Sequence, residues 1–336
     1  MPCKTPSFWY QSPEKLSFAT QALRPISSVY ALISRINYKL KKTIQYPDIK
    51  IICVGNITAG GSGKTPITIA LCELLKQKKL AKTPHILTRG YGRTDKASSF
   101  ILRKEDIGSI PVHQSGDEPR LLARAAPVII ATDRASGAKM AHDSGADIIV
   151  MDDGFQNPVL KKDVSLLVID GNMGFGNEKT IPAGPLRESP DRAIARAEAC
   201  IFIGEDKHDI LNRYIKAARP VFTAKIQVPS DFTPAQRGYT AFSGIGFPQK
   251  FNDTLKEIGC NISSFHSFAD HHTYTEKELN FLLDQSKRTG TILITTEKDY
   301  VRLPLKWQNE VTFLPISLTF DEPEKLWAFL KKELNK

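Results

Sequence analysis

A glycine-rich segment between Gly55 and Pro66, with the sequence GNITAGGSGKTP, has the composition of a phosphate-binding loop. Glycines let successive backbone N–H groups curve around a polyphosphate, and a helix that begins at the end of the loop adds the positive end of its dipole. Lys64 suits the β- and γ-phosphates of a nucleoside triphosphate, and the Thr65 hydroxyl suits Mg²⁺. These residues predict that the chain binds a nucleotide together with a magnesium ion.

The elements that such a loop needs are predicted on both sides of it. Residues 51–54 are apolar and mostly β-branched, which predicts a buried strand, and the apolar spacing of residues 70–75 predicts a helix. A glycine-rich turn with a surface lysine is the alternative, but chance rarely supplies strand, Gly-Lys-Thr and helix together. The strict motif has glycine at position 58, and we expect Gly60 and Gly61 to supply that freedom instead. The residues expected to bind the nucleotide are Thr58, Ala59, Gly60, Gly61, Ser62, Gly63, Lys64 and Thr65.

Two adjacent carboxylates follow a second apolar run. Residues 148–151 are continuously apolar, as in a parallel strand buried on both faces, and Asp152 and Asp153 come directly after them. The acid that holds the metal is expected at the carboxyl end of a strand beside the phosphate-binding strand. We expect one carboxylate to bind Mg²⁺ or its waters and the other to orient it or the loop. A simple Asp-Gly turn is the alternative here, and it is the favoured interpretation of a similar pair, Asp170 and Gly171.

Four more polar clusters fall where a globular core would not place them. Since strand ends of a doubly wound sheet meet at one edge, we expect these loops to line a single cleft for an anionic substrate. For any one of their arginines, taken alone, a solvated surface charge is favoured over a ligand. The clusters are Thr88 to Arg93, Gly116 to Pro119, Thr132 to Arg134, and Gly184 to Glu188.

The second half of the chain contains a pair of histidines. A new set of alternating helical and strand patterns begins after about residue 225, and His271 and His272 follow Asp270 near its middle. No third ligand stands at a recognised zinc spacing, so a catalytic or orienting imidazole is favoured over a metal site. The alternative is that the pair caps a helix predicted at residues 275–283.

Bulk properties limit the class of protein. A length of 336 residues predicts two domains, and the net charge of +10 favours anionic partners. The five cysteines contain no C-x-x-C pair, which is typical of a reducing cytoplasm, and the N-terminus lacks the plan of a signal peptide. The positive charge is dispersed except at residues 39–42, so no nucleic acid partner is expected.

An amphipathic helix is predicted before the phosphate-binding strand. Pro25 is expected to open it, since proline is tolerated in a first helical turn. Basic residues flank its apolar stripe, and the aromatic residues 8–10 precede it, a pattern typical of a helix that lies in an anionic membrane interface. The alternative is that the stripe packs on the domain's own core. The stripe consists of Ile26, Val29, Tyr30, Ile33, Ile36 and Leu40.

Together these patterns predict an α/β fold. We expect a P-loop NTPase-like, mostly parallel sheet with helices on both faces, a smaller C-terminal α/β domain and an N-terminal amphipathic helix. The expected boundaries are 1–47 for the membrane-associating segment, 48–225 for the P-loop kinase domain and 226–336 for the smaller domain.

The motifs, taken together and in order, resemble those of the tetraacyldisaccharide 4'-kinase family of lipid A synthesis. The resemblance covers nearly the whole chain, and the threonine at position 58 belongs to the family pattern. The matching segments are Val54 to Asn56, Gly60 to Pro66, Gly116 to Pro119, Asp152 to Gln156, Gly184 to Glu188, Asp270 to His272 and Thr296 to Asp299.

This resemblance implies a function. The chain is expected to transfer the γ-phosphate of ATP to the 4'-hydroxyl of tetraacyldisaccharide 1-phosphate, forming lipid IV A, as a peripheral protein on the cytoplasmic face of the bacterial inner membrane. It also implies that Asp117, paired with a histidine of the Asp270 to His272 segment, accepts the proton of the hydroxyl; His271 is favoured over His272 as this partner. Lys64 and Mg²⁺ are expected to stabilise the transferred phosphate, with Arg134 and Arg187 as candidates for phosphate charge. The candidate metal ligands are Thr65, Asp152, Asp153 and Glu188.

One rival from another class is a P-loop NTPase that switches a protein partner. It is disfavoured because residues 296–299, Thr-Glu-Lys-Asp, lack the spacing of the guanine-binding signature.

Overall fold

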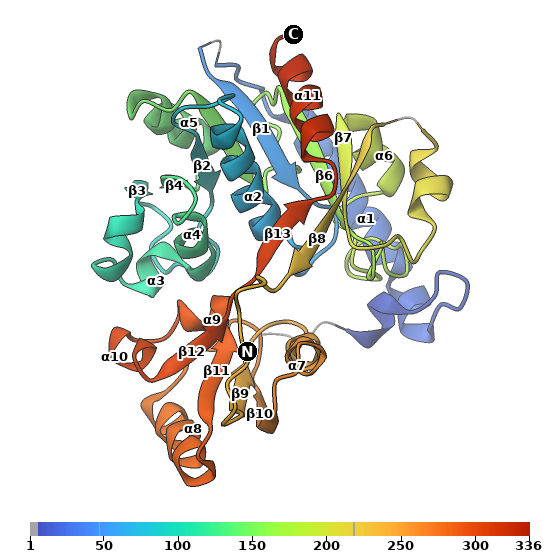
Figure 1. The fold of residues 1–336 in the computed structure, drawn as a ribbon. Coiled ribbons are helices and arrows are strands. Elements are labelled where there is room, and N and C mark those ends of the chain that lie inside the picture. Colours follow the sequence, from blue (N-terminus) through green and yellow to red (C-terminus); the bar gives the residue numbers. More distant parts are fainter. Residues whose placement is uncertain (1–5, 47, 218) are drawn as a thin grey trace.

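The computed structural model describes residues 6–46, 48–217 and 219–336. Two α/β units are joined where β8 leads into β9 and where β12 leads into β13 (Figure 1). Cys3 and the first five residues of the predicted N-terminal segment lie outside the described residues. The predicted combination of a large sheet and a smaller second α/β unit is confirmed.

The large sheet has nine strands, and β1, which leads into the phosphate-binding loop, lies at its centre. All neighbours pair in parallel except the edge strands β3 and β13, so the sheet is mostly parallel as predicted. In order across the sheet, the strands are β13 (Ser317–Phe320), β8 (Val221–Gln227), β7 (Ala199–Ile203), β6 (Val164–Asp170), β1 (Lys50–Gly55), β5 (Ile148–Asp152), β2 (His85–Thr88), β4 (Val128–Ile130) and β3 (Phe100–Leu102).

Both faces of this sheet are covered by helices. Alternate residues of the central strands point to opposite faces, so Ile52 and Val54 pack toward α2 (Lys64–Gln77) and α11 (Pro323–Leu334), while Ile51 and Cys53 face the other layer. That second layer contains α5 (Arg134–Asp143) and α6 (Pro190–Arg196). Burial on both faces explains why the strand sequences are continuously apolar.

Apart from α1 (Phe18–Leu40), the remaining helices are short or belong to the smaller unit. They are η1 (Ser7–Tyr10), η2 (Lys104–Gly108), α3 (Val112–Ser115), α4 (Asp117–Leu122), η3 (Leu211–Ile215), α7 (Pro248–Glu257), α8 (Glu276–Thr289), α9 (Glu297–Tyr300) and α10 (Leu305–Gln308). The smaller unit's parallel sheet consists of β10 (Ile262–Ser267), β9 (Tyr239–Ser243), β11 (Ile292–Thr296) and β12 (Val311–Leu314).

The end of the second unit differs from the predicted boundary at residue 336. After β12 the chain returns to the large sheet, where β13 pairs antiparallel with β8 and α11 packs against its helical layer. The reason is burial: Leu326, Leu330 and Leu334 form an apolar stripe at helical spacing that the first unit covers.

The N-terminal helix α1 (Phe18–Leu40) begins seven residues before the predicted start at Pro25. Ser17 caps it by accepting a hydrogen bond from the Thr20 N–H at 3.2 Å, and Pro25 lies inside the helix. The sequence pattern missed the capping signal at Ser17, and the helix runs through Pro25 although a proline there lacks the N–H of one helical hydrogen bond. Among the described residues, no helix is both long and apolar enough to cross a bilayer.

α1 attaches to the large unit through its polar side. Thr20 and Ser27 are its buried residues, and the Ser27 hydroxyl donates to the Thr180 carbonyl at 2.7 Å and accepts from the Ala183 N–H at 3.0 Å. The apolar stripe faces solvent, so the alternative that it packs on the protein's own core is wrong for five of its six predicted members. Exposed are Ile26, Val29, Ile33, Ile36 and Leu40, together with Phe18 and Leu32.

Candidate active site

The phosphate-binding loop joins β1 to α2 as predicted. α2 begins at Lys64, directly after Gly63, which has a φ of +77° and no room for a side chain, since a Cβ atom there would lie 2.3 Å from Ile203 Cδ1. Thr65 is half-buried in the first turn of α2. The Ala59 N–H donates to the Pro185 carbonyl at 2.8 Å, so the predicted loop at residues 184–188 borders the phosphate-binding loop.

Asn56 organises this loop, a role that the motif alone does not assign to it. It is fully buried, and its amide nitrogen donates to the Thr58 carbonyl at 2.8 Å and to the Ser62 hydroxyl at 2.5 Å. Its amide oxygen accepts from Lys64 Nζ at 3.1 Å. A polar residue directly after a buried strand is the signal that identifies it, because such a residue needs several hydrogen bonds to be buried.

Asp152 ends β5 next to the loop. Its carboxylate is buried and accepts from the Thr68 hydroxyl at 3.2 Å and the Thr88 hydroxyl at 3.5 Å. None of the residues that the structure describes forms an ion pair with it. Burial, with the nearby charges of Glu118 and Asp153, raises the pKa of Asp152 to about 7. A buried carboxylate without a cation is a suitable ligand for one.

The other two predicted metal ligands are each paired with an arginine. Asp153 lies 3.0 Å from Arg187 Nη1 and 3.8 Å from Lys64 Nζ; burial alone raises its pKa, but these two cations bring the pKa below its usual value. Both oxygens of Glu188 accept from Arg196 Nη2, at 2.7 and 2.8 Å. Among the described residues, no three His, Cys, Asp or Glu side chains are arranged to hold a metal ion by themselves.

Arg196 was not predicted as part of the site. Its guanidinium carbon lies 5.0 Å from the centre of the Phe155 ring and 4.6 Å from that of Tyr38, which belongs to the last turns of α1. The N-terminal helix therefore touches the arginine that holds Glu188.

Arg134 lies deeper than a ligand for substrate phosphate would. Only 2% of it is exposed, and its two terminal nitrogens donate to the carbonyls of Ala131 and Asp152 at 3.3 and 3.4 Å. Burial and the neighbouring Arg89 lower the pKa of Arg134 to about 10. It braces the ends of β4 and β5, whereas Arg187, on the loop beside Lys64, is partly exposed.

Asp117, at the start of α4, is bound by side chains from the smaller unit. Its Oδ2 atom accepts from Arg302 Nε at 2.7 Å, from Arg302 Nη2 and from His271 Nδ1 at 3.1 Å. Burial alone raises the pKa of Asp117, but the bond from His271 and the charge of Arg302 bring it well below its usual range. The predicted pair of Asp117 and His271 is therefore in contact, across two units and a sequence separation of 154 residues.

The two histidines differ in their surroundings. His271 has a φ of +57°, rare for a residue with a side chain, and its Nε2 lies 3.3 Å from Lys298 Nζ. His272 points elsewhere: it contacts Glu278 at 3.1 Å, the residue that completes the cap of α8, and stacks on Phe268. His272 thus supports the cap of α8, as the alternative interpretation of the histidine pair predicted, and His271 is the imidazole that contacts Asp117.

The residues around the phosphate-binding loop and those around Asp117 lie close together, because α4, which begins at Asp117, packs against α2, which begins at Lys64. Glu118 follows Asp117 and forms an ion pair with Lys298 at 3.4 Å, yet its charge also acts on Asp152 beside the phosphate-binding loop. The exposed Tyr91, from the loop after β2, lies with its ring 5.6 Å from the His271 ring. Three of the four predicted polar clusters, at residues 88–93, 116–119 and 184–188, therefore gather here.

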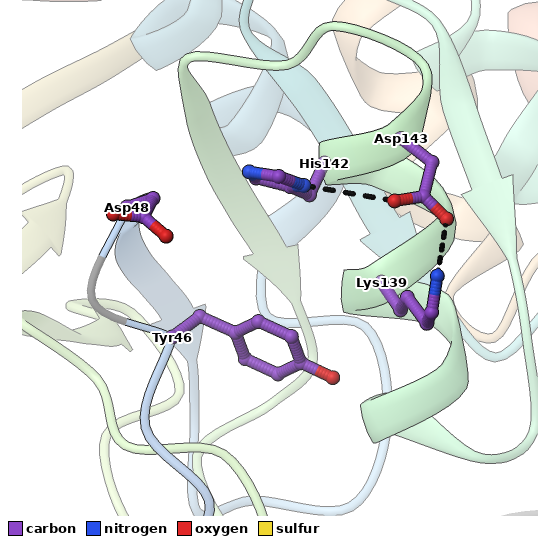
Figure 2. A pocket seen from close by; sticks show the side chains of 5 residues that line it. All are labelled: Tyr46, Asp48, Lys139, His142 and Asp143. Carbon is purple, nitrogen blue, oxygen red and sulfur yellow. Dashed lines mark hydrogen bonds and ion pairs between the residues drawn. The ribbon is translucent and has the colours of Figure 1, made fainter.

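A separate hollow lies at the opposite end of the strands, where β1 begins (Figure 2). None of the predicted site residues lines it. Its exposed Lys139 and Asp143 pair at 2.6 Å within α5. It is lined by Tyr46, Asp48, Lys139, His142 and Asp143.

Comparisons with known proteins relate the whole chain to one family. The family model described as tetraacyldisaccharide-1-P 4'-kinase matches residues 19–335. A tetraacyldisaccharide 4'-kinase of Rhodospirillum rubrum is 40% identical over 333 residues, covering 98% of this chain and 97% of the relative. The corresponding protein of Paramagnetospirillum magneticum is 40% identical over 326 residues, or 96% of each chain. The crystal structure of LpxK from Aquifex aeolicus in complex with ATP superposes with a TM-score of 0.74 at 28% identity, over 94% of this chain and 99% of that one.

Proposed function

The chain belongs to the tetraacyldisaccharide-1-P 4'-kinase family, and we propose that it transfers the γ-phosphate of ATP to the 4'-hydroxyl of tetraacyldisaccharide 1-phosphate, forming lipid IV A. One observation carries the proposal. A phosphate-binding loop with Lys64 at the start of α2 lies near a carboxylate paired with a histidine, Asp117 with His271, because Asp117 begins α4, which packs against α2. A kinase needs these two halves, one for the phosphate and one for the acceptor hydroxyl.

In the proposed reaction, the 4'-oxygen forms a bond to the γ-phosphorus while the bond from that phosphorus to the β,γ-bridging oxygen breaks. The hydroxyl proton passes to the pair of Asp117 and His271, and the electrons of the broken bond stay on ADP. Lys64 stabilises the charge of the phosphate oxygens. Arg187, which lies 3.0 Å from Asp153 and beside the loop, is the better placed of the two predicted arginines to add positive charge there.

The donor set fits Mg²⁺. This ion prefers a few carboxylates together with phosphate oxygens and water, and it neutralises charge that develops on the phosphates. We propose Asp152 as the direct protein ligand together with Thr65, because its buried carboxylate has hydroxyl partners and no cation among the described residues. Asp153 and Glu188, each already paired with an arginine, orient the metal's water shell or the loop.

We further propose that the protein works as a peripheral protein on the cytoplasmic face of the inner membrane, with α1 in the lipid interface. A helix that buries Ser27 and Thr20 and exposes Ile26, Val29 and Ile33 gains stability when an apolar phase covers that face. The substrate's acyl chains resist leaving the bilayer at about 0.8 kcal/mol per CH₂. An enzyme for this lipid therefore benefits from a helix of this kind.

The test is transfer of ³²P from γ-labelled ATP, with Mg²⁺ and detergent, to tetraacyldisaccharide 1-phosphate. We expect labelled lipid with the wild type and at least a ~100-fold lower rate with Lys64→Ala, which removes a preorganised positive charge. Lys78→Ala, at the residue that follows the same helix and paired with Glu324 away from the loop, is the matched control. Phosphate released to water without labelled lipid would overturn the assignment of the acceptor.

A further inference from the structure

We propose that Arg302 is the positioning residue of the acceptor half: it fixes the carboxylate of Asp117 so that one of its oxygens stays available for the reaction. This inference rests on the proposed kinase function and adds a residue that no motif identifies. Arg302 stands three residues beyond the Thr296 to Asp299 segment, just after the short helix α9. It belongs to the smaller unit, whereas Asp117 belongs to the larger one.

The geometry of the contact is specific. Arg302 donates from both Nε and Nη2 to the same atom, Asp117 Oδ2, which also faces His271 Nδ1. The second oxygen, Oδ1, has no hydrogen-bond partner among the described residues. The side chains of Arg302 and Asp117 are only 6% and 5% exposed, so water screens the pair weakly. The arrangement keeps Asp117 ionised and leaves Oδ1 to take part in accepting the proton.

Besides Asp117, two groups of the smaller unit hold Arg302 in place. Its Nη1 donates to the Gly244 carbonyl and to Asp299 Oδ1, both at 2.9 Å. Asp299 is fully buried and also accepts from the Tyr274 hydroxyl at 2.9 Å and the Thr296 hydroxyl at 2.6 Å. Such a network of charged groups has little freedom to rearrange, because every displaced group leaves another buried and unpaired.

Gly244 also helps to position His271. The backbone N–H of His271 donates to the Gly244 carbonyl at 3.1 Å, and Arg302 binds the same oxygen. A side chain at Gly244 would meet the Tyr274 hydroxyl at 2.9 Å and Asp299 Oδ1 at 3.1 Å, so glycine is needed there. Arg302 therefore sets Asp117 relative to His271, and both partners reach Asp117 from one rigid part of the smaller unit.

Lysine could not replace Arg302. The planar fork of arginine can donate from several fixed nitrogens at once, to Asp117 on one side and to Asp299 and Gly244 on the other, whereas an ammonium group is a single point. Lys298 makes a different contact, to His271 Nε2 and Glu118. The charged or titratable groups that face the Asp117 and His271 pair are Arg302, Lys298, Glu118, Asp270 and Tyr91.

The experiment compares Arg302→Met and Arg302→Lys with the wild type in the ³²P transfer to tetraacyldisaccharide 1-phosphate. Since general-base catalysis contributes about 10²- to 10⁴-fold, we expect Arg302→Met to lower kcat about 100-fold. We expect KM for ATP to stay within about threefold, because the phosphate-binding loop is untouched. Arg302→Lys, which keeps the charge and has the better prospect of folding, is expected to fall about 10-fold.

Two further readouts separate positioning from a structural role. Loss of the cation raises the pKa of Asp117, so the acid limb of the pH dependence of kcat is expected to move to higher pH in Arg302→Met. Added guanidinium ions are expected to restore part of kcat. The control is Arg124→Met, which removes another arginine that crosses between the units, to Glu297, without contact to Asp117; we expect its pH profile to match the wild type.

The outcomes are distinguishable. Folded Arg302→Met with kcat near the wild-type value, or an equal fall in Arg124→Met with no shift of the acid limb in either variant, overturns the positioning role alone. A wild type that labels no lipid overturns the kinase function, and the role of Arg302 in it as well.

Discussion

The nucleotide half and the acceptor half of the proposed site are built in different ways. The nucleotide half comes largely from one continuous stretch, β1, the loop and α2, in which Asn56 and Lys64 are eight residues apart. The acceptor half combines Asp117 with His271 and Arg302, which lie 154 and 185 residues further along the chain and in another unit. A single stretch can preorganise a phosphate site, but the acceptor site depends on how the two units meet.

The halves also treat their carboxylates in opposite ways. Asp152, in the nucleotide half, is buried without a cation, and its pKa is raised to about 7. Asp117, in the acceptor half, is supplied with cations by the protein, and its pKa is lowered. Environments that shift the pKa values of two carboxylates in opposite directions indicate different tasks for them. Asp152 is suited to an external cation such as Mg²⁺, whereas Asp117 stays ionised and can accept a hydrogen bond from the acceptor hydroxyl.

The largest effects are expected when one aspartate in each half, Asp117 or Asp152, is replaced by asparagine. Asp117→Asn should lower kcat about 1000-fold with KM for ATP within about threefold, because it removes the proton acceptor only. Asp152→Asn should instead raise the Mg²⁺ concentration needed for half-maximal rate. The steady-state assay over a Mg²⁺ series checks both, with the exposed Asp143→Asn as control. If both variants change the Mg²⁺ requirement equally, the division into halves is wrong.

The histidines test the acceptor half alone. His271→Gln should lower kcat about 100-fold, since it removes the partner of Asp117. His272→Gln should leave kcat within about threefold and lower the thermal stability slightly, because His272 supports the helix cap at Glu278. Rates and melting temperatures of the two variants, measured side by side, decide this. A large rate loss in His272→Gln would exchange the two assignments.

A smaller effect is expected in the nucleotide half from Asn56→Ala. The variant leaves Lys64 Nζ without its amide partner and the loop without two donated hydrogen bonds, so affinity for Mg²⁺ and ATP should fall about 10-fold. Calorimetric titration measures it, and exposed Asn212→Ala serves as control. Loss of kcat with unchanged nucleotide affinity would contradict the role given to Asn56.

The acid stability of the protein should depend on Asp117. A carboxyl whose pKa is lowered by folding stabilises the folded state fully above its unfolded pKa, near 4, and this contribution is lost as pH falls toward the folded pKa. The wild type should therefore lose about 1 kcal/mol more than Asp117→Asn between pH 6 and pH 3. Urea unfolding at several pH values measures the difference. Parallel curves for the two proteins would show that the pair contributes no such dependence.

The smallest effect on rate is expected at α1, which belongs to neither half. Val29→Ser with Ile33→Ser should lower co-sedimentation with anionic vesicles several-fold and leave the melting temperature unchanged, because both side chains are exposed. Ser27→Ala should leave co-sedimentation unchanged and lower the stability by about 1 kcal/mol, because the hydrogen bonds to Thr180 and Ala183 are lost. Unchanged vesicle binding in the double variant would refute the interfacial role.

Much of the nucleotide half could be predicted from the sequence because its signals are local. An apolar strand, a glycine loop and an apolar helix follow one another, so the pattern alone gives β1, the loop and α2. The carboxylates after β5 are equally local, and the parallel sheet brings them to the same edge.

The arginines that hold Asp117 and Glu188 could not be predicted. Arg302 and Arg196 look like ordinary charged positions until the fold brings Asp117 and Glu188 to them. The return of β13 and α11 to the large sheet is equally hidden, because an apolar helix pattern says that a face is buried but not which unit buries it. At the N-terminus, α1 begins after the Ser17 cap and not at Pro25, where the sequence pattern predicted its start.

The attachment of α1 by its polar side has a practical consequence for protein engineering. Ser27 binds Thr180 and Ala183, and Thr180 in turn bridges to Leu186, whose other neighbour is Thr58 of the phosphate-binding loop. Trimming the helix to obtain a better-behaved sample would therefore loosen the wall of the nucleotide site. Replacing the exposed apolar side chains and keeping the helix is the route that preserves this wall.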